Sequence, residues 1–387
     1  MCGNFLKSER RHLYVMVFVI LFVFFSFFIN SPFSLLVGAL VVGVYSISDI
    51  IQKPVSRNVL VSLLLFSMFI IPVFLALNHG FSVFFYYVST VFCFFAARKM
   101  VSIHRCLVLQ AYQFSFYFLF FIFIFLYYIY RDEAEPFGAI IEGASTNGVP
   151  SYFIVLQVTL SLIAFSINGR LPLLSAAMTF FIAVLGIGRG AILAAFAIFA
   201  FSFLFNFCLD VKYKRTGRVL GVIGFVAVLF FVFCFSYDAV FEYFYARTNL
   251  SRGLYDSARV EMISDYVGGI SAIGLFAGSS FDGTVIAELY GNNPHNSFIR
   301  SHSYMGLGVF LMVLFSPFLF FFSRVKFSAK IAYFSLVMIL FFRAFSEPIL
   351  FPTLLDIFYF VIFLFFFKGQ AVRRPTVLHN KGAVLWR

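Results

Sequence analysis

One histidine and several arginines are the side chains of this sequence best suited to chemistry. His295 follows Asn293 and Pro294, which are favourable residues at the start of a helix. If that helix continues unbroken, His295, His302 and Gly306 share one face. The positive end of the helix would keep the His295 imidazole neutral, which is the form that a general base needs. We therefore predict a base at His295; a structural capping histidine is the alternative.

Arg189 lies in a glycine-rich reversal between two apolar runs. The segment Gly186-Ile-Gly188-Arg189-Gly190 leaves almost no loop there, and its glycines permit a tight turn with close backbone approach. The reversal would hold the guanidinium at about the depth of lipid headgroup phosphates. Charged groups at this depth tend to be functional, whereas an arginine that merely extends to the interface is the alternative.

A pair of opposite charges lies near the C-terminus of the chain. Arg343 and Glu347 are four residues apart, just before Pro348. Residues at this spacing lie on one helical face and can form an ion pair. We interpret the pair as mainly structural.

The composition shows what kind of element must position these groups. Of 387 residues, 62% are hydrophobic and only 11% are charged, and the mean hydropathy is +1.00. Soluble domains are about 45–50% apolar and about 25% charged. This difference excludes a water-soluble enzyme, a nucleic-acid-binding module and a disordered tail protein.

Apolar runs long enough to cross a bilayer recur along the whole chain. A span needs about 20 apolar residues, and the runs predict a single all-α polytopic membrane domain over 1–387 with about 12 transmembrane helices. The expected spans are 13–30, 33–51, 59–77, 81–97, 106–130, 153–167, 171–188, 190–209, 219–236, 304–323, 331–350 and 353–367.

The positive charges predict the orientation of these spans. About three quarters of the 28 lysines and arginines fall on the side of the N-terminus, which predicts that both chain ends are cytoplasmic. All the positive residues left on the outer side are arginines, whose planar fork suits bidentate binding of phosphate. They are Arg131, Arg189, Arg247, Arg252, Arg259, Arg300 and Arg343.

Two outer segments are longer than turns and are therefore candidates for function. The first is the acidic segment 131–152. The second, 237–303, lies between the ninth and tenth expected spans and contains several of the outer arginines with His295 and His302. Its aromatic start, 237–245, suits an amphipathic helix on the membrane surface or one packed on the bundle.

Several of these segments together resemble the motifs of the O-antigen polymerase and O-antigen ligase superfamily. Their order, the twelve expected spans and the large outer loop agree with that family. The segments are Gly188-Arg189-Gly190-Ala191, Ser257-Ala258-Arg259-Val260-Glu261-Met262, His295-Asn296-Ser297-Phe298 ahead of Gly306-Leu307-Gly308, and Ser346-Glu347.

The resemblance implies a GT-C-like fold and a glycosyltransferase that needs no metal or other cofactor. It implies that Arg189 and Arg259 bind the diphosphate of an undecaprenyl-diphosphate-linked oligosaccharide, and that His295 assists transfer of the glycan at the periplasmic face of the bacterial inner membrane. Membrane lipid and a chain-length regulator are the further partners it suggests, and nucleic acid is not expected. Further candidate substrate contacts are Arg247, Arg252, Arg300, His302 and Glu347.

Three functions fit this set of residues. The segment His-Asn-Ser-Phe-Ile at 295–299 and the short acidic segment 131–152 favour the polymerase, which joins lipid-linked repeats. A ligase, which transfers the glycan to lipid A-core, is the alternative, although Val309 stands where ligases tend to have a glycine. A lipid-linked oligosaccharide flippase or another transporter is a third, but the sequence shows no internal repeat, and its ionisable residues cluster at one end of the spans.

Overall fold

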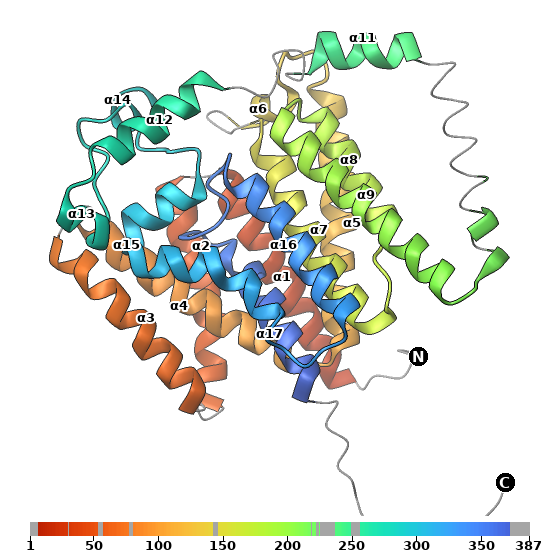
Figure 1. The fold of residues 1–387 in the computed structure, drawn as a ribbon, viewed down its shortest axis with the longest axis horizontal. Coiled ribbons are helices and arrows are strands. Elements are labelled where there is room, and N and C mark those ends of the chain that lie inside the picture. The colour runs from red at the N-terminus through yellow and green to blue at the C-terminus, as the bar shows by residue number, and fades with distance from the viewer. Residues whose placement is uncertain are drawn as a thin grey trace, which may run out of the picture.

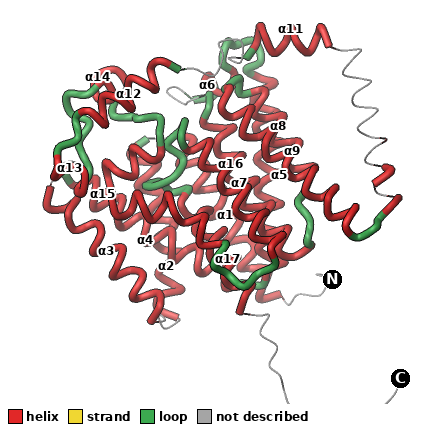
Figure 2. The backbone as a smooth tube through the Cα atoms, in the orientation of Figure 1, coloured by secondary structure: helices red, strands yellow, loops and turns green. Residues whose placement is uncertain are grey.

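The structure is a computed structural model that describes residues 7–29, 31–52, 57–76, 80–141, 146–217, 219–221, 224, 237–248 and 256–371. Helices and loops, and no strands, make up this part of the chain (Figure 2). The helices are α1 (Lys7–Ile29), α2 (Pro32–Gln52), α3 (Arg57–Ala76), α4 (Phe81–Ser102), α5 (Arg105–Ile129), α6 (Pro136–Ala139), α7 (Gly148–Asn168), α8 (Leu173–Leu185), α9 (Arg189–Lys212), α11 (Tyr237–Arg247), α12 (Ser257–Gly268), α13 (Ala272–Ala277), α14 (Val285–Tyr290), α15 (Ser297–Phe315), the 3₁₀ helix η2 (Ser316–Phe320), α16 (Phe327–Ala344) and α17 (Asp356–Ala371).

Seven helices are long and apolar enough to cross a membrane, which supports the prediction of a polytopic membrane protein. They cover Arg10–Ile29, Phe81–Ser102, Arg105–Ile129, Gly148–Asn168, Arg189–Lys212, Ser297–Phe320 and Phe327–Ala344. Shorter apolar helices cover Pro32–Ser48, Leu63–Ala76 and Leu173–Leu185. Each expected span falls on a helix except 219–236, most of which lies outside the described residues. The total of about twelve spans stays a prediction.

Helix α7 is the centre of the bundle. Its residues from Val149 to Phe165 are buried on every face, because α5, α8, α16 and α17 pack around it (Figure 1). A helix that is apolar on all sides is expected in such a position. Edge-to-face aromatic contacts join α7 to its neighbours, for example Tyr152 against Phe24 of α1 and against Phe358 of α17.

The two ends of the bundle differ. Helices α6, α11, α12 and α14 gather at one end, whereas α1 begins and α17 ends at the other (Figure 1). Helix α11 confirms the expected aromatic helix: Tyr237, Phe241 and Tyr245 stack along one exposed face. This arrangement agrees with two chain ends on one side and the large loop 237–303 on the other.

We expect the segment after α12 to face the periplasm and the segment after α9 to face the cytoplasm. The reason is the excess of lysine and arginine on the side of the chain ends. The measurement uses reporter fusions after Ile270 and after Lys214, one reporter active only outside the cytoplasm and one active only inside. Activity of each reporter at the opposite position would reverse the topology.

Helix α15 differs from the sequence prediction in where it begins and in its continuity. Helix α15 begins after Asn296, whose side chain accepts hydrogen bonds from the N–H groups of Phe298 and Ile299, so Asn293 is not its N-cap. The helix is also broken at Gly306, where φ is +75°. A Cβ there would lie 2.7 Å from the carbonyl oxygen of Phe276, so the close approach of this backbone requires glycine.

The expected span 331–350 is also too long. Helix α16 ends at Ala344, and a loop follows as far as α17. Pro348 and Pro352 lie in this loop and lack the N–H that a helix requires. Ser297 fixes the loop, because its hydroxyl donates to the carbonyl of Glu347 and accepts from the N–H of Leu350. The start of α15 and the residues after α16 are therefore held together.

Candidate functional site

The glycine reversal places Arg189 at the first residue of α9. Helix α8 ends at Leu185, and Ile187 has a positive φ of 64°, so the predicted tight turn is confirmed. Gly188 lies directly against the side chain of Asn147, and a Cβ on Gly188 would come within 1.8 Å of the Asn147 amide oxygen. The absence of a side chain at Gly188 allows this approach.

Asp256 joins Arg189 and Arg259, the two arginines expected to bind the diphosphate. Its carboxylate lies 2.9 Å from Arg189 Nη2 and 3.6 Å from Arg259 Nε. Asp256 is also the N-cap of α12 and accepts a hydrogen bond from the backbone N–H of Arg259. The carboxylate thus holds two guanidinium groups from segments 70 residues apart in one place.

The pKa of Asp256 reflects this position. Burial by itself raises the pKa of the carboxyl, but the hydrogen bond from Arg189 and the charge of Arg259 outweigh it, so the pKa lies below its usual value. Asp256 is therefore ionised at neutral pH. Arg189 and Arg259 are 18% and 28% exposed, so both remain accessible to a ligand.

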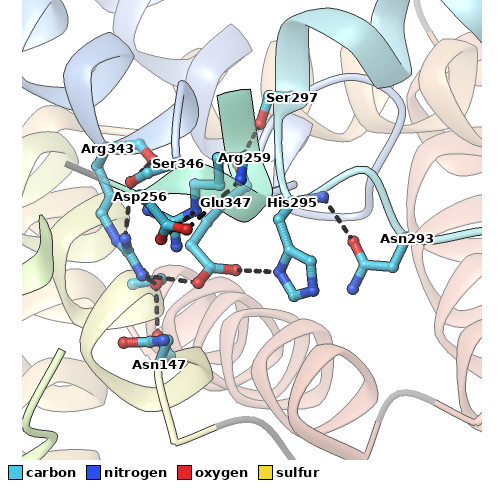
Figure 3. Close-up of polar contacts among 10 residues, drawn as sticks. Asn147, Asp256, Arg259, Asn293, His295, Ser297, Arg343, Ser346 and Glu347 are labelled. Atoms are coloured by element: carbon cyan, nitrogen blue, oxygen red, sulfur yellow. Dashed lines mark hydrogen bonds and ion pairs between the residues drawn. The ribbon is translucent and has the colours of Figure 1, made fainter. Parts of the chain in front are cut away.

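A second group of charges surrounds Glu347 (Figure 3). Arg343 Nη2 lies 3.2 Å from Glu347 Oε1, as the i,i+4 spacing predicted, and His295 Nδ1 lies 3.9 Å from Glu347 Oε2. Arg343 is only 1% exposed. Its other donors bind Ser151 Oγ of α7, at 2.7 and 3.1 Å, and Ser346 Oγ, at 2.9 Å. The buried guanidinium is thus compensated both by charge and by hydrogen bonds, as a buried charge requires.

His295 does not have the environment that the sequence predicted. It lies two residues before α15 with a φ of +44°, and its backbone N–H donates to Asn293 Oδ1. It therefore does not share a helical face with His302 and Gly306. The group beside its ring is the carboxylate of Glu347 (Figure 3). A carboxylate next to a histidine orients the ring.

The two groups form one electrostatic cluster, because the charge of Arg259 also acts on Glu347; Figure 3 shows Asp256 and Arg259 beside Glu347. Burial raises the pKa of the Glu347 carboxyl, but the charges of Arg343, His295 and Arg259 lower it more, and the carboxyl is ionised at neutral pH. Three guanidinium groups thus face two carboxylates, those of Asp256 and Glu347. The cluster keeps an excess of positive charge, which favours an anionic ligand.

Two of the further candidate residues make their contacts elsewhere. Arg300 donates to the hydroxyl of Tyr86 at 2.8 Å and lies over its ring. His302 lies 2.8 Å from both the Tyr266 hydroxyl and the Leu275 carbonyl. Because a carbonyl can only accept, Nε2 of His302 carries the proton and Nδ1 accepts from Tyr266.

Burial raises the pKa of Tyr266 to about 12, so this hydroxyl keeps the proton that it donates to His302. His302 therefore joins α12, α13 and α15 as a structural link. The side chain of Arg247 and all of Arg252 lie outside the described residues.

Sequence reasoning missed several residues of the cluster. Asp256 carried a signal that could have found it, because an aspartate directly before a helix is a favoured N-cap. Ser151 carried none, since it is one of many small residues in the buried helix α7. In the part of the chain that the structure describes, no three His, Cys, Asp or Glu side chains are grouped so that they could hold a metal ion.

Comparison of the chain with protein-family models, with curated proteins and with solved structures gives no match. The interpretation of the cluster thus depends on its geometry and on the resemblance of its motifs. All of the resembling segments except Gly306-Leu307-Gly308 contribute residues to it: Arg189, Arg259, His295, Ser346 and Glu347.

Proposed function

We propose that this chain is a GT-C-like glycosyltransferase of the O-antigen polymerase type, which transfers an undecaprenyl-diphosphate-linked glycan to the hydroxyl of a lipid-linked repeat. The observation that carries the proposal is the convergence of the first residue of α9, the first turn of α12, the segment before α15 and the loop after α16 on one positive cluster. These are the segments whose sequences resemble the motifs of that family.

The cluster suits the leaving group of this reaction. When the bond between the sugar and the diphosphate breaks, the bonding electron pair stays on the diphosphate oxygen, where negative charge develops. Arg189 and Arg259 are held side by side by Asp256 and would stabilise this charge, because fixed donors aimed at a developing charge lower the barrier. Their forked guanidinium groups can each bind two phosphate oxygens.

The histidine suits the acceptor. The acceptor oxygen forms the new bond to the sugar, and its proton must leave. His295 is 29% exposed and would take this proton at its free ring nitrogen, while Glu347 stabilises the resulting imidazolium. Glu347 is in turn held by Arg343 and by the contacts of its loop to Ser297. His295 would thus act as the general base, with Glu347 and Arg343 holding its ring in place.

The membrane setting supports a lipid-linked donor. A carrier with a polyprenyl tail lies in the bilayer and presents its diphosphate at the interface. The cluster lies at the ends of the membrane-spanning helices α7, α9 and α16 rather than at their midpoints. Transporters usually bind near the midplane, so the position of the cluster favours transfer at the membrane surface. We place this surface at the periplasmic side of the inner membrane.

Analysis of surface glycan and carrier-linked lipid in a strain that lacks the protein tests the proposal. We expect the surface glycan of this strain to be limited to a single repeat. Expression of the wild-type chain, or of an Arg131→Lys variant as control, should restore the long polymer. Accumulation of finished polymer on the carrier would instead identify a ligase. Unflipped repeat on the cytoplasmic side would identify a transporter, and either result would contradict the polymerase assignment.

A further inference from the structure

A cavity of about 340 Å³ lies at the end of the bundle away from the cluster. It is lined by the start of α5, the ends of α7 and α9, the start of α16 and the end of α17. Arg189 begins α9, and Leu209, which lines the cavity, follows 20 residues later. At about 1.5 Å per residue, the two lie about 30 Å apart, which is the thickness of the bilayer hydrocarbon core.

The charged residues that line the cavity are both positive, Arg105 and Lys326. The nearby carboxylate of Asp210 is paired with Arg170 and Arg215. Helices α5 and α16 both begin at the cavity, and helix N-termini carry partial positive charge and favour anions. The cavity is therefore strongly electropositive.

Arg105 also has an unused donor. Its guanidinium lies 5.5 Å from the ring centre of Phe365, and its Nη2 is buried with no hydrogen-bond acceptor among the described residues. A buried charged donor without an acceptor is costly. Because Arg105 lines the cavity, an anion bound there would supply a counter-charge for this guanidinium.

The rest of the lining is mixed: Phe165, Ile167 and Phe366 form apolar wall, whereas Asn168 and Ser328 are polar. The polar groups suit a phosphate from either a lipid or solution, but only a lipid also has an acyl chain that the apolar part of the wall would remove from water. We propose that the cavity binds the phosphate group of an anionic phospholipid, from the leaflet opposite the active site. Arg105 and Lys326 hold the phosphate, and the apolar walls hold the start of an acyl chain.

Native mass spectrometry of the full chain, released from micelles that contain phosphatidylglycerol or phosphatidylcholine, tests this proposal. We expect one phosphatidylglycerol to be retained by the wild type in preference to phosphatidylcholine. Arg105→Gln should weaken its binding about 10- to 100-fold, as expected for the loss of a charged hydrogen bond. Lys326→Gln provides a second variant on a different helix in case Arg105→Gln does not fold.

Lys330→Gln is the matched control, because Lys330 lies one turn further along α16, is absent from the lining and donates to the Phe321 carbonyl. Phosphatidylglycerol binding that Arg105→Gln and Lys326→Gln leave unchanged would overturn the proposal. Inorganic phosphate supplies the second arm. If it raises the melting temperature of the delipidated wild type but not of these variants, and no lipid is retained, the ligand is free phosphate and the lipid assignment is wrong.

Discussion

Arg189→Lys and Arg259→Lys variants are expected to transfer glycan about 10²- to 10³-fold more slowly than the wild type. Lysine keeps the charge but is a single point charge on a flexible stem, whereas the guanidinium fork can bind two phosphate oxygens at once. Each variant also loses part of the contact that Asp256 makes with both arginines. The measurement is the initial rate of polymer formation with purified protein in lipid nanodiscs and a labelled lipid-linked repeat.

Arg131→Lys is the matched control for these variants. Arg131 is also an outer arginine, but it is 53% exposed, and its guanidinium lies over the ring of Tyr128. We expect wild-type activity from it. Melting temperatures of all three variants show whether they are folded. If folded Arg189→Lys and Arg259→Lys proteins both polymerise at the wild-type rate, the assignment of the diphosphate site is wrong.

His295→Ala is expected to lower turnover about 10²- to 10⁴-fold while leaving the binding of the lipid-linked donor unchanged. The reason is the proposed role of the imidazole, which lies beside the ionised Glu347 and would accept the proton of the acceptor hydroxyl. Single-turnover rates and equilibrium binding of the donor, measured on the same preparation, separate the two effects. His302→Ala is the comparison: since both its ring nitrogens make structural contacts, it should lower the melting temperature more than the rate of transfer.

Full activity of His295→Ala would remove the base from the mechanism. Loss of wild-type activity on addition of a chelator would contradict the metal-independent reaction that the motif resemblance implies. Glu347→Gln adds a check on the pair of His295 and Glu347. It leaves the buried Arg343 without its counter-ion and should be less stable than His295→Ala.

The stability of the folded protein should also depend on pH through Glu347. The pKa of Glu347 is lower in the folded protein than its ordinary value of 4.5. The carboxylate therefore stabilises the fold above pH 4.5, and this contribution is lost as the pH falls further, through the lowered pKa. The melting temperature of the wild type should fall over this acidic range, with a smaller fall in Glu347→Gln.

The sequence predicted the helices of this protein better than their ends. Long apolar runs specify a membrane span almost by themselves, because every backbone group in lipid must be paired within a helix. Where a run is interrupted, the outcome depends on contacts from elsewhere in the chain. The span expected over 331–350 stops at Ala344, ahead of two prolines, and the loop that follows is fixed by Ser297, a residue about 50 positions earlier.

The candidate site shows the same division. Residue type and neighbouring glycines were enough to single out Arg189, Arg259 and His295 in the sequence. The structure brings all three into one cluster. Sequence spacing did not predict the partners of these residues. Glu347 became the neighbour of His295 through the folding of the loop after α16, and a positive φ at His295 removed it from the helix that the pattern predicted.

The order of the charged residues along the chain also determines when the cluster is completed during synthesis, because Glu347 comes after all the others. Arg189, Asp256 and Arg259 leave the ribosome first, and all the members of these two ion pairs precede His295 and Glu347 in the chain. His295 has no carboxylate partner until α16 and the loop behind it have been made. Arg343 and Glu347 emerge only four residues apart, so the buried Arg343 guanidinium enters the bilayer with its counter-ion already beside it. The ion pairs of Asp256 can therefore form before the contact between His295 and Glu347, which requires the loop after α16.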